Sequence, residues 1–575
     1  QCLGSVTMQN LYSRLAPYLL TLIELLLVVA AGALILFSSR NSSRKDQPAA
    51  FRTIERAFAR FARRRRLSVL VAGLGVIAIR VALIPILGVP QPVAHDEFSY
   101  LLAADTFAHG KLTNPTHPMW VHFESFHILE QPTYMSMYPP AQGLVLAAGQ
   151  ILGHPWIGQL LATALMCSAI CWMLQAWVPP PWALLGAVLA ALRLAILSYW
   201  MNGYWSASIV ALGGALVLGA WPRIRRRQRV RDALLMSSGL IILANSRPYE
   251  GLVFSIPVAL AMLVWLFNKN HPPFRQSLPR VVMPIFLCLL VASIATGYYY
   301  DRVTGSPFRM AYQIEAASYG AAPVFLWQTP HPENVYHHEV MRDFYSWELN
   351  VFETNRTFDG YLNNLWERLT FCWRFYLGPL LTIPLLALPC IIRRRRMWLP
   401  IAICAVMVVA MSVETWNMPH YFAPATCALY LVLVQGMRSL WHWSPTGRPL
   451  GRAIVRAIPM LACAMILLRL TAAAAHVQIE PSWPRNDFGR VIIERQLEHL
   501  PGRQLVIVDY GPSHDFDHEW VFNHADIDAA KIVWARDMGE EANLQLLRYF
   551  KDRRVWKVNA DASPPQLEQY EVSAK

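Results

Sequence analysis

The sequence has few charged residues. Only 15% of its 575 residues are Asp, Glu, Lys or Arg, and 55% are hydrophobic, whereas soluble domains carry about 25% charged residues. This composition excludes the surface of an ordinary soluble protein. Runs of about 17 to 25 apolar residues recur along the chain, and each is long enough to cross a bilayer as a helix. We therefore expect a polytopic α-helical membrane protein.

Cysteine pairs with the spacing of a metal or redox motif are also absent. The nine cysteines lie almost wholly within apolar segments, so we interpret them as small apolar residues of the core. The chain contains no internal repeat and no low-complexity linker.

Basic residues are scarce in alternate loops. The short loops at 90–140, 201–204, 247–249 and 414–419 contain only Lys111 and Arg247, whereas the segments 40–66, 223–231, 393–396 and 438–456 are rich in arginine. The pattern is the positive-inside asymmetry of cytoplasmic loops and argues against nucleic-acid binding. A patch that binds anionic lipids is compatible with the same placement. The loops that are poor in basic residues are therefore expected to lie on the outer face.

Twelve apolar runs are expected to form transmembrane helices. An N-terminal helix and basic cytoplasmic segment (1–66) would precede a membrane domain (67–473) with two long outer loops, 90–140 and 301–369. The first run lacks the features of a signal peptide, so we expect it to be retained. The runs lie near 17–37, 67–89, 155–177, 182–200, 205–221, 232–246, 250–267, 280–300, 371–392, 398–413, 420–437 and 454–473.

The composition changes beyond residue 474. "DFGRVIIERQLEHL" predicts an amphipathic helix, and "RQLVIVDYG", "AKIVWARDMG", "NLQLLRYFKD" and "RRVWKVNAD" predict strand, strand, helix and strand. This alternation is typical of a small α/β domain, and the topology places this domain, 474–575, outside the cytoplasm.

An acidic pair, Asp96 and Glu97, comes directly after the second apolar run, with no cation beside it. Asp96 alone could cap the helix "EFSYLLAADTFAHG", which Gly110 would end. A cap needs only one acid, however, and a carboxylate at a dielectric boundary has a raised proton affinity that suits a general base. The pair is therefore a candidate catalytic centre, with capping as the alternative.

The rest of the 90–140 loop is rich in histidine and proline. The alternation around His122 and Glu124 predicts a short extended stretch, and a loop packed on the helix ends is the alternative. No spacing matches a recognised ligand motif, so no metal is assigned, although carboxylate and imidazole groups could still assemble around a divalent metal in space. "YPPAQG" (138–143) is expected to direct the chain into the next helix.

These features resemble the first outer loop of the GT-C membrane glycosyltransferases, and above all the protein O-mannosyltransferase and aminoarabinose-transferase branch. The acidic pair after an early transmembrane helix, the helix that follows and the "YPP" segment carry the resemblance. "NGYWSAS" (202–208), "ANSRPYEG" (244–251) and "PHYFAPATCALYLVL" (419–433) stand at further outer helix ends, as similar segments do in those enzymes. The resemblance covers residues 67 to 440 and does not extend to the tail beyond 474.

The resemblance implies transfer of a sugar from a polyprenyl-phosphate carrier to a lipid, glycan or protein acceptor, on the outer face of a bacterial inner membrane. Asp96 would be the general base and Glu97 would orient the acceptor or support that base. Direct displacement with a single base implies inversion. The leaving phosphate requires a cation, for which Arg247 is the first candidate and Lys111 the second. An ion pair with Glu250 or Asp96 is the alternative for Arg247.

Further substrate contacts are expected from residues at the same face. No cofactor is expected, and the partners are the lipid-linked donor, the acceptor and membrane lipids. Two other classes stay open: a transporter or flippase of lipid-linked saccharides, and a polymerase or ligase that would use the 301–369 loop. Transporters tend to contain internal repeats, which favours the enzyme here. The expected contact residues are His122, Glu124, Tyr138, Glu250, His420 and Tyr421.

Overall fold

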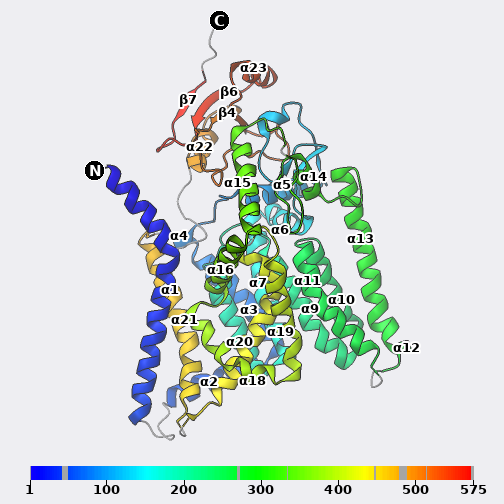
Figure 1. The fold of residues 1–575 in the computed structure, drawn as a ribbon, viewed down its shortest axis with the longest axis vertical. Helices are drawn as coiled ribbons and strands as arrows, with labels where there is room; N and C mark the ends of the chain where they lie inside the picture. Colours follow the sequence, from blue (N-terminus) through cyan, green and yellow to red (C-terminus); the bar gives the residue numbers. More distant parts are fainter. Residues whose placement is uncertain are drawn as a thin grey trace.

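The protein is a bundle of helices with a small sheet domain on one end (Figure 1). The computed structural model describes residues 2–41, 49–268, 272–332, 334–416, 418–445, 448–477, 479, 489–512 and 514–570. The side chains of 2–17, 39–41 and 49–50 are not described.

Six helical stretches are long and apolar enough to cross a membrane, and a pair of helices bent by 92° adds a seventh if it is one span. The chain is therefore a multi-pass membrane protein. The bent pair is α16 (Phe358–Tyr376) with Gly378–Ile392, which contains α17 (Gly378–Thr382) and α18 (Leu388–Ile392). The six stretches are Tyr18–Ser38 within α1 (Cys2–Asn41), α7 (Pro155–Trp177), α9 (Ala207–Arg227), α11 (Pro248–Leu266), Phe274–Thr304 with α12 (Phe274–Ser277) and α13 (Met283–Thr304), and α21 (Leu450–Ala474).

The expected count of about twelve spans is not confirmed by this measure. The remaining apolar runs do form helices, but four of these are too short, and α3 contains Arg65, Arg66 and Arg80. Proline or arginine lies within or beside several of them, and both interrupt an apolar helix. These helices are α3 (Arg65–Ala82), α8 (Pro180–Ala190), α10 (Val230–Ala244), α19 (Trp398–Met411) and α20 (Thr426–Trp441).

The centre of the bundle consists of α7 and α9, whose apolar stretches are 72% and 89% buried. Small residues let neighbouring elements approach them closely. A Cβ atom at Gly214 of α9 would lie 2.0 Å from the carbonyl oxygen of Pro424, in the 3-10 helix Pro419–Ala425. This close packing holds the segment that carries His420 and Tyr421 against the centre of the bundle.

The 90–140 loop folds into α5 (His95–Ala108), a 3-10 helix (Trp120–Phe123) and a three-stranded antiparallel sheet, and leads into α6 (Pro140–Ile151). The prediction of an extended stretch at His122 is wrong, because His117 Nδ1 accepts a hydrogen bond from the Met119 amide at 2.9 Å and tightens a helical turn. The strands lie in the order β1 (Asn114–Pro115), β3 (Thr133–Ser136), β2 (Ile128–Leu129). The 301–369 loop forms α14 (Ala311–Ser318), α15 (Glu339–Arg356) and the start of α16.

The tail forms a small α/β domain with a four-stranded sheet of order β5-β4-β6-β7. Strand β4 is parallel to β5 and β6, and β7 is antiparallel to β6. The predicted strands and helices are present and β7 is additional; residues 487 and 488 of the predicted amphipathic helix lie outside the described residues. The elements are α22 (Gly489–Glu498), β4 (Gln504–Asp509), β5 (Ile532–Arg536), α23 (Glu540–Tyr549), β6 (Arg554–Asn559) and β7 (Leu567–Gln569).

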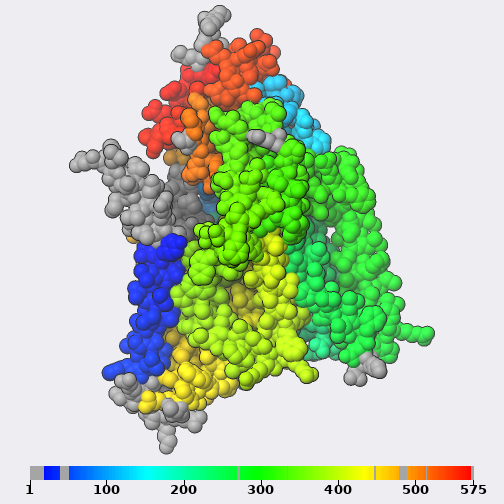
Figure 2. All heavy atoms as spheres, in the orientation of Figure 1, coloured from blue at the N-terminus to red at the C-terminus, as the bar shows by residue number. Residues whose placement is uncertain are grey.

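This domain shares a hydrophobic core with the 90–140 loop. Leu102 of α5 and Tyr134 of β3 pack in one buried cluster with Val533 and Leu546 of the domain. Near the end of α5, the Asp105 carboxylate accepts a hydrogen bond from the Ala525 amide at 2.8 Å. Figure 2 shows the orange and red atoms of the domain lying against the green atoms of the 301–369 loop.

Removing Arg536 is expected to weaken this docking. Its Nη2 lies 2.7 Å from Glu519 Oε2, both side chains are at most 2% exposed, and its Nε donates to the Glu124 carbonyl at 2.6 Å. Arg536→Gln leaves a buried carboxylate unpaired, which costs about 3 to 5 kcal/mol. The thermal unfolding midpoint should fall clearly, whereas Arg503→Gln, which removes an exposed pair with Asp552, should cost less than about 1 kcal/mol. Equal midpoints for the two variants would contradict this role of Arg536.

Candidate active site

A cavity of about 870 Å³ lies where the helical bundle meets the two long loops and the C-terminal domain. The segment 87–97, the turn before α6, the start of α11 and helix α15 all contribute to its walls. Phe344, Trp347 and Trp416 give it an aromatic side. Six polar residues of the lining carry its chemistry, and only some of them were predicted from the sequence. They are His95, Asp96, His127, Tyr138, Arg247 and Glu348.

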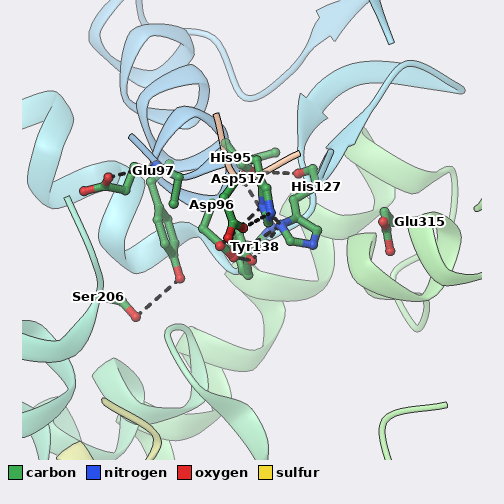
Figure 3. A network of polar contacts seen from close by, with 12 residues as sticks. His95, Asp96, Glu97, His127, Tyr138, Ser206, Glu315 and Asp517 are labelled. Atoms are coloured by element: carbon green, nitrogen blue, oxygen red, sulfur yellow. Dashed lines mark hydrogen bonds and ion pairs between the residues drawn. The ribbon is translucent and has the colours of Figure 1, made fainter. Parts of the chain in front are cut away.

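Asp96 lies at the centre of a polar network in this cavity (Figure 3). Its Oδ1 accepts a hydrogen bond from the Tyr138 hydroxyl and lies 3.2 Å from His127 Nδ1, while Oδ2 lies 3.4 Å from His95 Nδ1. Burial alone would raise the pKa of Asp96, but the charge and hydrogen bond of His127, with smaller effects of His95 and Tyr138, lower it instead. Asp96 is therefore ionised at neutral pH.

His127 is the partner that the sequence did not single out. Burial would lower its pKa, but Asp96, Glu315 and Glu348 outweigh this effect and raise it to about 9. His95, whose Nδ1 lies 3.0 Å from His127 Nδ1, has its pKa lowered to about 4 by burial and by His127. An imidazolium and a neutral imidazole therefore lie side by side next to one carboxylate.

The backbone of His127 is held in a left-handed conformation, with a φ of 60°. Its carbonyl oxygen accepts hydrogen bonds from the Ser99 hydroxyl at 2.6 Å and from the Met137 amide at 3.1 Å. A residue other than glycine adopts this conformation only when its surroundings enforce it, and such residues cluster at functional sites.

The capping of α5 falls to Glu97 and not to Asp96. The helix begins at His95 with Ala94 as its N-cap, so the alternative that Asp96 caps the helix is wrong. Glu97 is the capping residue: it accepts hydrogen bonds from the backbone amides of Val93 at 2.9 Å, Ala94 at 3.3 Å and Tyr204 at 2.8 Å. The raised proton affinity predicted for the pair also belongs to Glu97 alone, because burial raises its pKa to about 7.

Arg247 forms the cationic side of the cavity. Its Nη1 lies 3.0 Å from Glu250 Oε1, and its guanidinium carbon lies 4.0 Å from the centre of the Tyr421 ring. His420, next to Tyr421 in the sequence, is buried. Its Nδ1 and the Tyr199 hydroxyl share a hydrogen bond of 3.1 Å. Arg247, His420 and Tyr421 line the same cavity as Asp96 and Glu97, whereas Glu250 lies outside the lining and holds Arg247 in place.

Besides Glu250, three predicted site residues lie outside this cavity. Lys111 is exposed beyond the far end of α5, about 20 Å along the helix from Asp96. His122 is buried, with its Nε2 unpaired within the described part of the chain. Glu124 is 1% exposed and holds the 301–369 loop through Tyr319 at 2.7 Å and His337 at 2.9 Å. The structure gives none of the three a direct place in the cavity.

The sequence missed residues that reach the cavity from distant segments. Trp347 and Glu348 come from α15, and Asp517 comes from the loop after β4, where its Oδ1 lies 3.9 Å from His95 Nε2. The histidine- and aspartate-rich composition around Asp517 was the only signal in the sequence.

The donor atoms of His95, Asp96 and His127 lie within 4.8 Å of one another. Two imidazoles and a carboxylate suit a divalent transition metal by donor type. In the structure these groups share hydrogen bonds with each other and with Tyr138.

The fold is similar to that of known enzymes. Crystal structures of ArnT from Cupriavidus metallidurans, in the apo state and bound to undecaprenyl phosphate, match with a TM-score of 0.50 and 12% and 13% identity, over 84% of this chain and 92% of that one. The oligosaccharyltransferase of Archaeoglobus fulgidus matches at 0.48, with 11% identity over 86% of this chain and 68% of that one. The likeness to the ArnT structures shows that the chain shares their overall fold. No family model matches the sequence, and no curated protein does.

The GT-C resemblance inferred from the 90–140 loop is thus confirmed as a likeness of fold. The similarity to ArnT spans most of the chain, since 84% of it is covered.

Glu348 provides a pH test of the cavity. No described residue forms a hydrogen bond with it, and burial, opposed by His127 and reinforced by Glu315, raises its pKa to about 8. Because this half-buried carboxyl group is more stable when neutral, its contribution to the stability of the fold is present at pH 5 and is lost as the pH rises through about 8. Glu348→Gln should therefore unfold at a higher temperature than the wild type at pH 9, with little difference at pH 5. Glu353→Gln, an exposed position on the same helix, is the control, and parallel curves for wild type and Glu348→Gln would contradict the assignment.

Proposed function

We propose that this protein is an inverting glycosyltransferase that moves a sugar from a polyprenyl-phosphate carrier to an acceptor, on the outer face of a bacterial inner membrane. One observation carries the proposal: an ionised carboxylate, Asp96, and a fixed guanidinium, Arg247, line one cavity at the ends of membrane helices. A base for the acceptor and a cation for the leaving group are the two requirements of such a transfer.

The position of Arg247 suits a donor that resides in the bilayer. Arg247 precedes α11, one of the helices that can cross the membrane, so its guanidinium lies at the level where a lipid phosphate would be found. The cavity continues to Leu87 and Val89, which give it an apolar side beside α3 and α4 (Ile84–Leu87). A protein of the same fold binds undecaprenyl phosphate, which supports a polyprenyl-phosphate donor.

Asp96 would accept the proton of the acceptor. As the acceptor oxygen or nitrogen bonds to the anomeric carbon, the bond from that carbon to the phosphate oxygen breaks and the proton moves to Asp96. The polyprenyl phosphate leaves as an anion next to Arg247. Asp96 is a weak base at rest, but the acceptor becomes acidic as the new bond forms, so an always ionised carboxylate is adequate. His95, neutral and 3.4 Å away, is placed to take the proton onward.

The charges inside the bundle give the transporter alternative little support. Glu24 and Arg193 pair with each other at 3.0 Å, and Arg80 donates to Asn202 and to the Gly88 carbonyl. These contacts hold segments of the bundle together, so the three charged residues have a structural role. Asp96, His127 and Arg247, by contrast, line the cavity at the domain end of the bundle.

Asp96→Asn is expected to reduce transfer of sugar from a polyprenyl-phosphate donor by at least about 100-fold, because general-base catalysis contributes that much or more. Glu97→Gln is the matched control, since its carboxylate serves the backbone: the variant should unfold at a lower temperature but keep its turnover in the folded fraction. Sugar released from the donor is the measured quantity. Full activity in Asp96→Asn would refute the assignment.

Arg247→Lys is expected to reduce turnover by about 10- to 100-fold, because lysine keeps the charge but loses the planar fork that binds phosphate oxygens. Lys111→Gln removes an exposed cation just after α5, outside the cavity, and should leave the kinetics unchanged. Equal effects of the two substitutions on donor turnover would show that Arg247 does not meet the phosphate.

A further inference from the structure

A second cavity, of about 630 Å³, lies at the opposite end of the same helices. It is bordered by the last turns of α7, α9 and α11 and by residues 395–399, where α19 begins. The candidate active site touches the other ends, since Arg247 precedes α11 and Trp416 follows α19. The 19 residues of α11 span about 28 Å, so the two cavities are separate sites.

Four arginines line this second cavity, which we call the arginine cavity: Arg225, Arg226, Arg395 and Arg396. Its lining contains no Asp or Glu. Arg226 donates to the Ala176 carbonyl at 3.3 Å and Arg225 lies 5.6 Å from the Trp221 ring centre, but none of the four forms an ion pair with a described residue. Four positive charges around one cavity repel one another, so the cluster is complementary to an anion.

Pairing of arginine with an acid does occur at this end of the bundle. Arg456 of α21 lies 2.7 Å from Glu55 of α2 (Ala49–Arg63). The arginines of the cavity, in contrast to Arg456, form no ion pair with an acid among the described residues.

The walls of the arginine cavity are aromatic and adjoin apolar surface. Trp177, Trp221, Trp265 and Trp398 line it, and the rings of Trp221 and Trp265 meet edge to face with centres 6.0 Å apart. Val264 is 69% exposed and Trp398 is 58% exposed. Tryptophan favours the boundary between lipid and water, and exposed apolar side chains beside it suit acyl chains.

We propose that the arginine cavity binds the phosphate headgroup of an anionic phospholipid, whose acyl chains lie along the exposed apolar side chains of α11 and α19. Guanidinium groups match phosphate oxygens, and basic pockets between membrane helices recognise such headgroups. The positive-inside rule accounts for arginines at this end of the bundle but does not require a cavity or four tryptophans around them. The site is independent of the sugar transfer proposed above.

The test uses the full chain in phosphatidylcholine nanodiscs with increasing cardiolipin. Native mass spectrometry measures the lipid that stays bound after the protein is released from the nanodisc. Thermal unfolding measures the stabilisation by cardiolipin. Two variants each remove two cavity arginines, Arg225→Gln with Arg226→Gln and Arg395→Gln with Arg396→Gln. Each is expected to bind cardiolipin about 30-fold more weakly. The control, Arg227→Gln with Arg229→Gln, removes the same charge from the same segment outside the cavity and should change binding less than about threefold.

Equal cardiolipin retention in the wild type and in both cavity variants would overturn the proposal. Stabilisation by inorganic phosphate equal to that by cardiolipin would also overturn it, because the site would then take a soluble anion. If a glutamine variant does not fold, Arg225→Lys with Arg226→Lys keeps the charge needed for insertion. It should still bind more weakly than the wild type, since lysine lacks the fork, and unchanged binding would count against the site.

Discussion

The pairing of Asp96 with His127 is the interaction on which the rest of the cavity depends. Two opposite charges, whose side chains are 18% and 13% exposed, lie next to each other, and each would be costly without the other. Asp96 is delivered by the first turn of α5, while His127 is held in a strained conformation by Ser99 and by the strand that leads to Tyr138. The network therefore fixes the relative positions of a helix, a loop and the start of α6, and the neutral His95 completes it.

The membrane helices could be predicted because an apolar run is a local property of the sequence. The strands and the second helix of the tail were also predictable, since each is a run of residues with one local preference. The number of spans was not, because α3 contains three arginines and other helices, such as α19 with proline near its start, are shorter than the length that a span requires. The strands of the 90–140 loop escaped prediction because two of them contain only two residues, and their pairing is set by tertiary contacts.

The sequence could predict only those site residues that stand at helix ends on one side of the bundle. Asp96, Arg247 and His420 stand at such ends and meet in one cavity. Lys111 and Glu124 lie outside the cavity because neighbours along a loop need not be neighbours in space: α5 carries Lys111 away, and Glu124 contacts the 301–369 loop. His127 resembled the other histidines of its loop, since its backbone strain and its partner are visible only in the folded chain.

Helix α5 has a consequence for communication through the molecule. Its first turn carries Asp96, and near its last turn Asp105 is tied to the Ala525 amide of the C-terminal domain. Asp96 and Asp105 lie on the same rigid helix of 14 residues, about two and a half turns apart. One helix therefore carries both attachments, so the position of the Asp96 carboxylate depends on how the C-terminal domain is seated on the bundle.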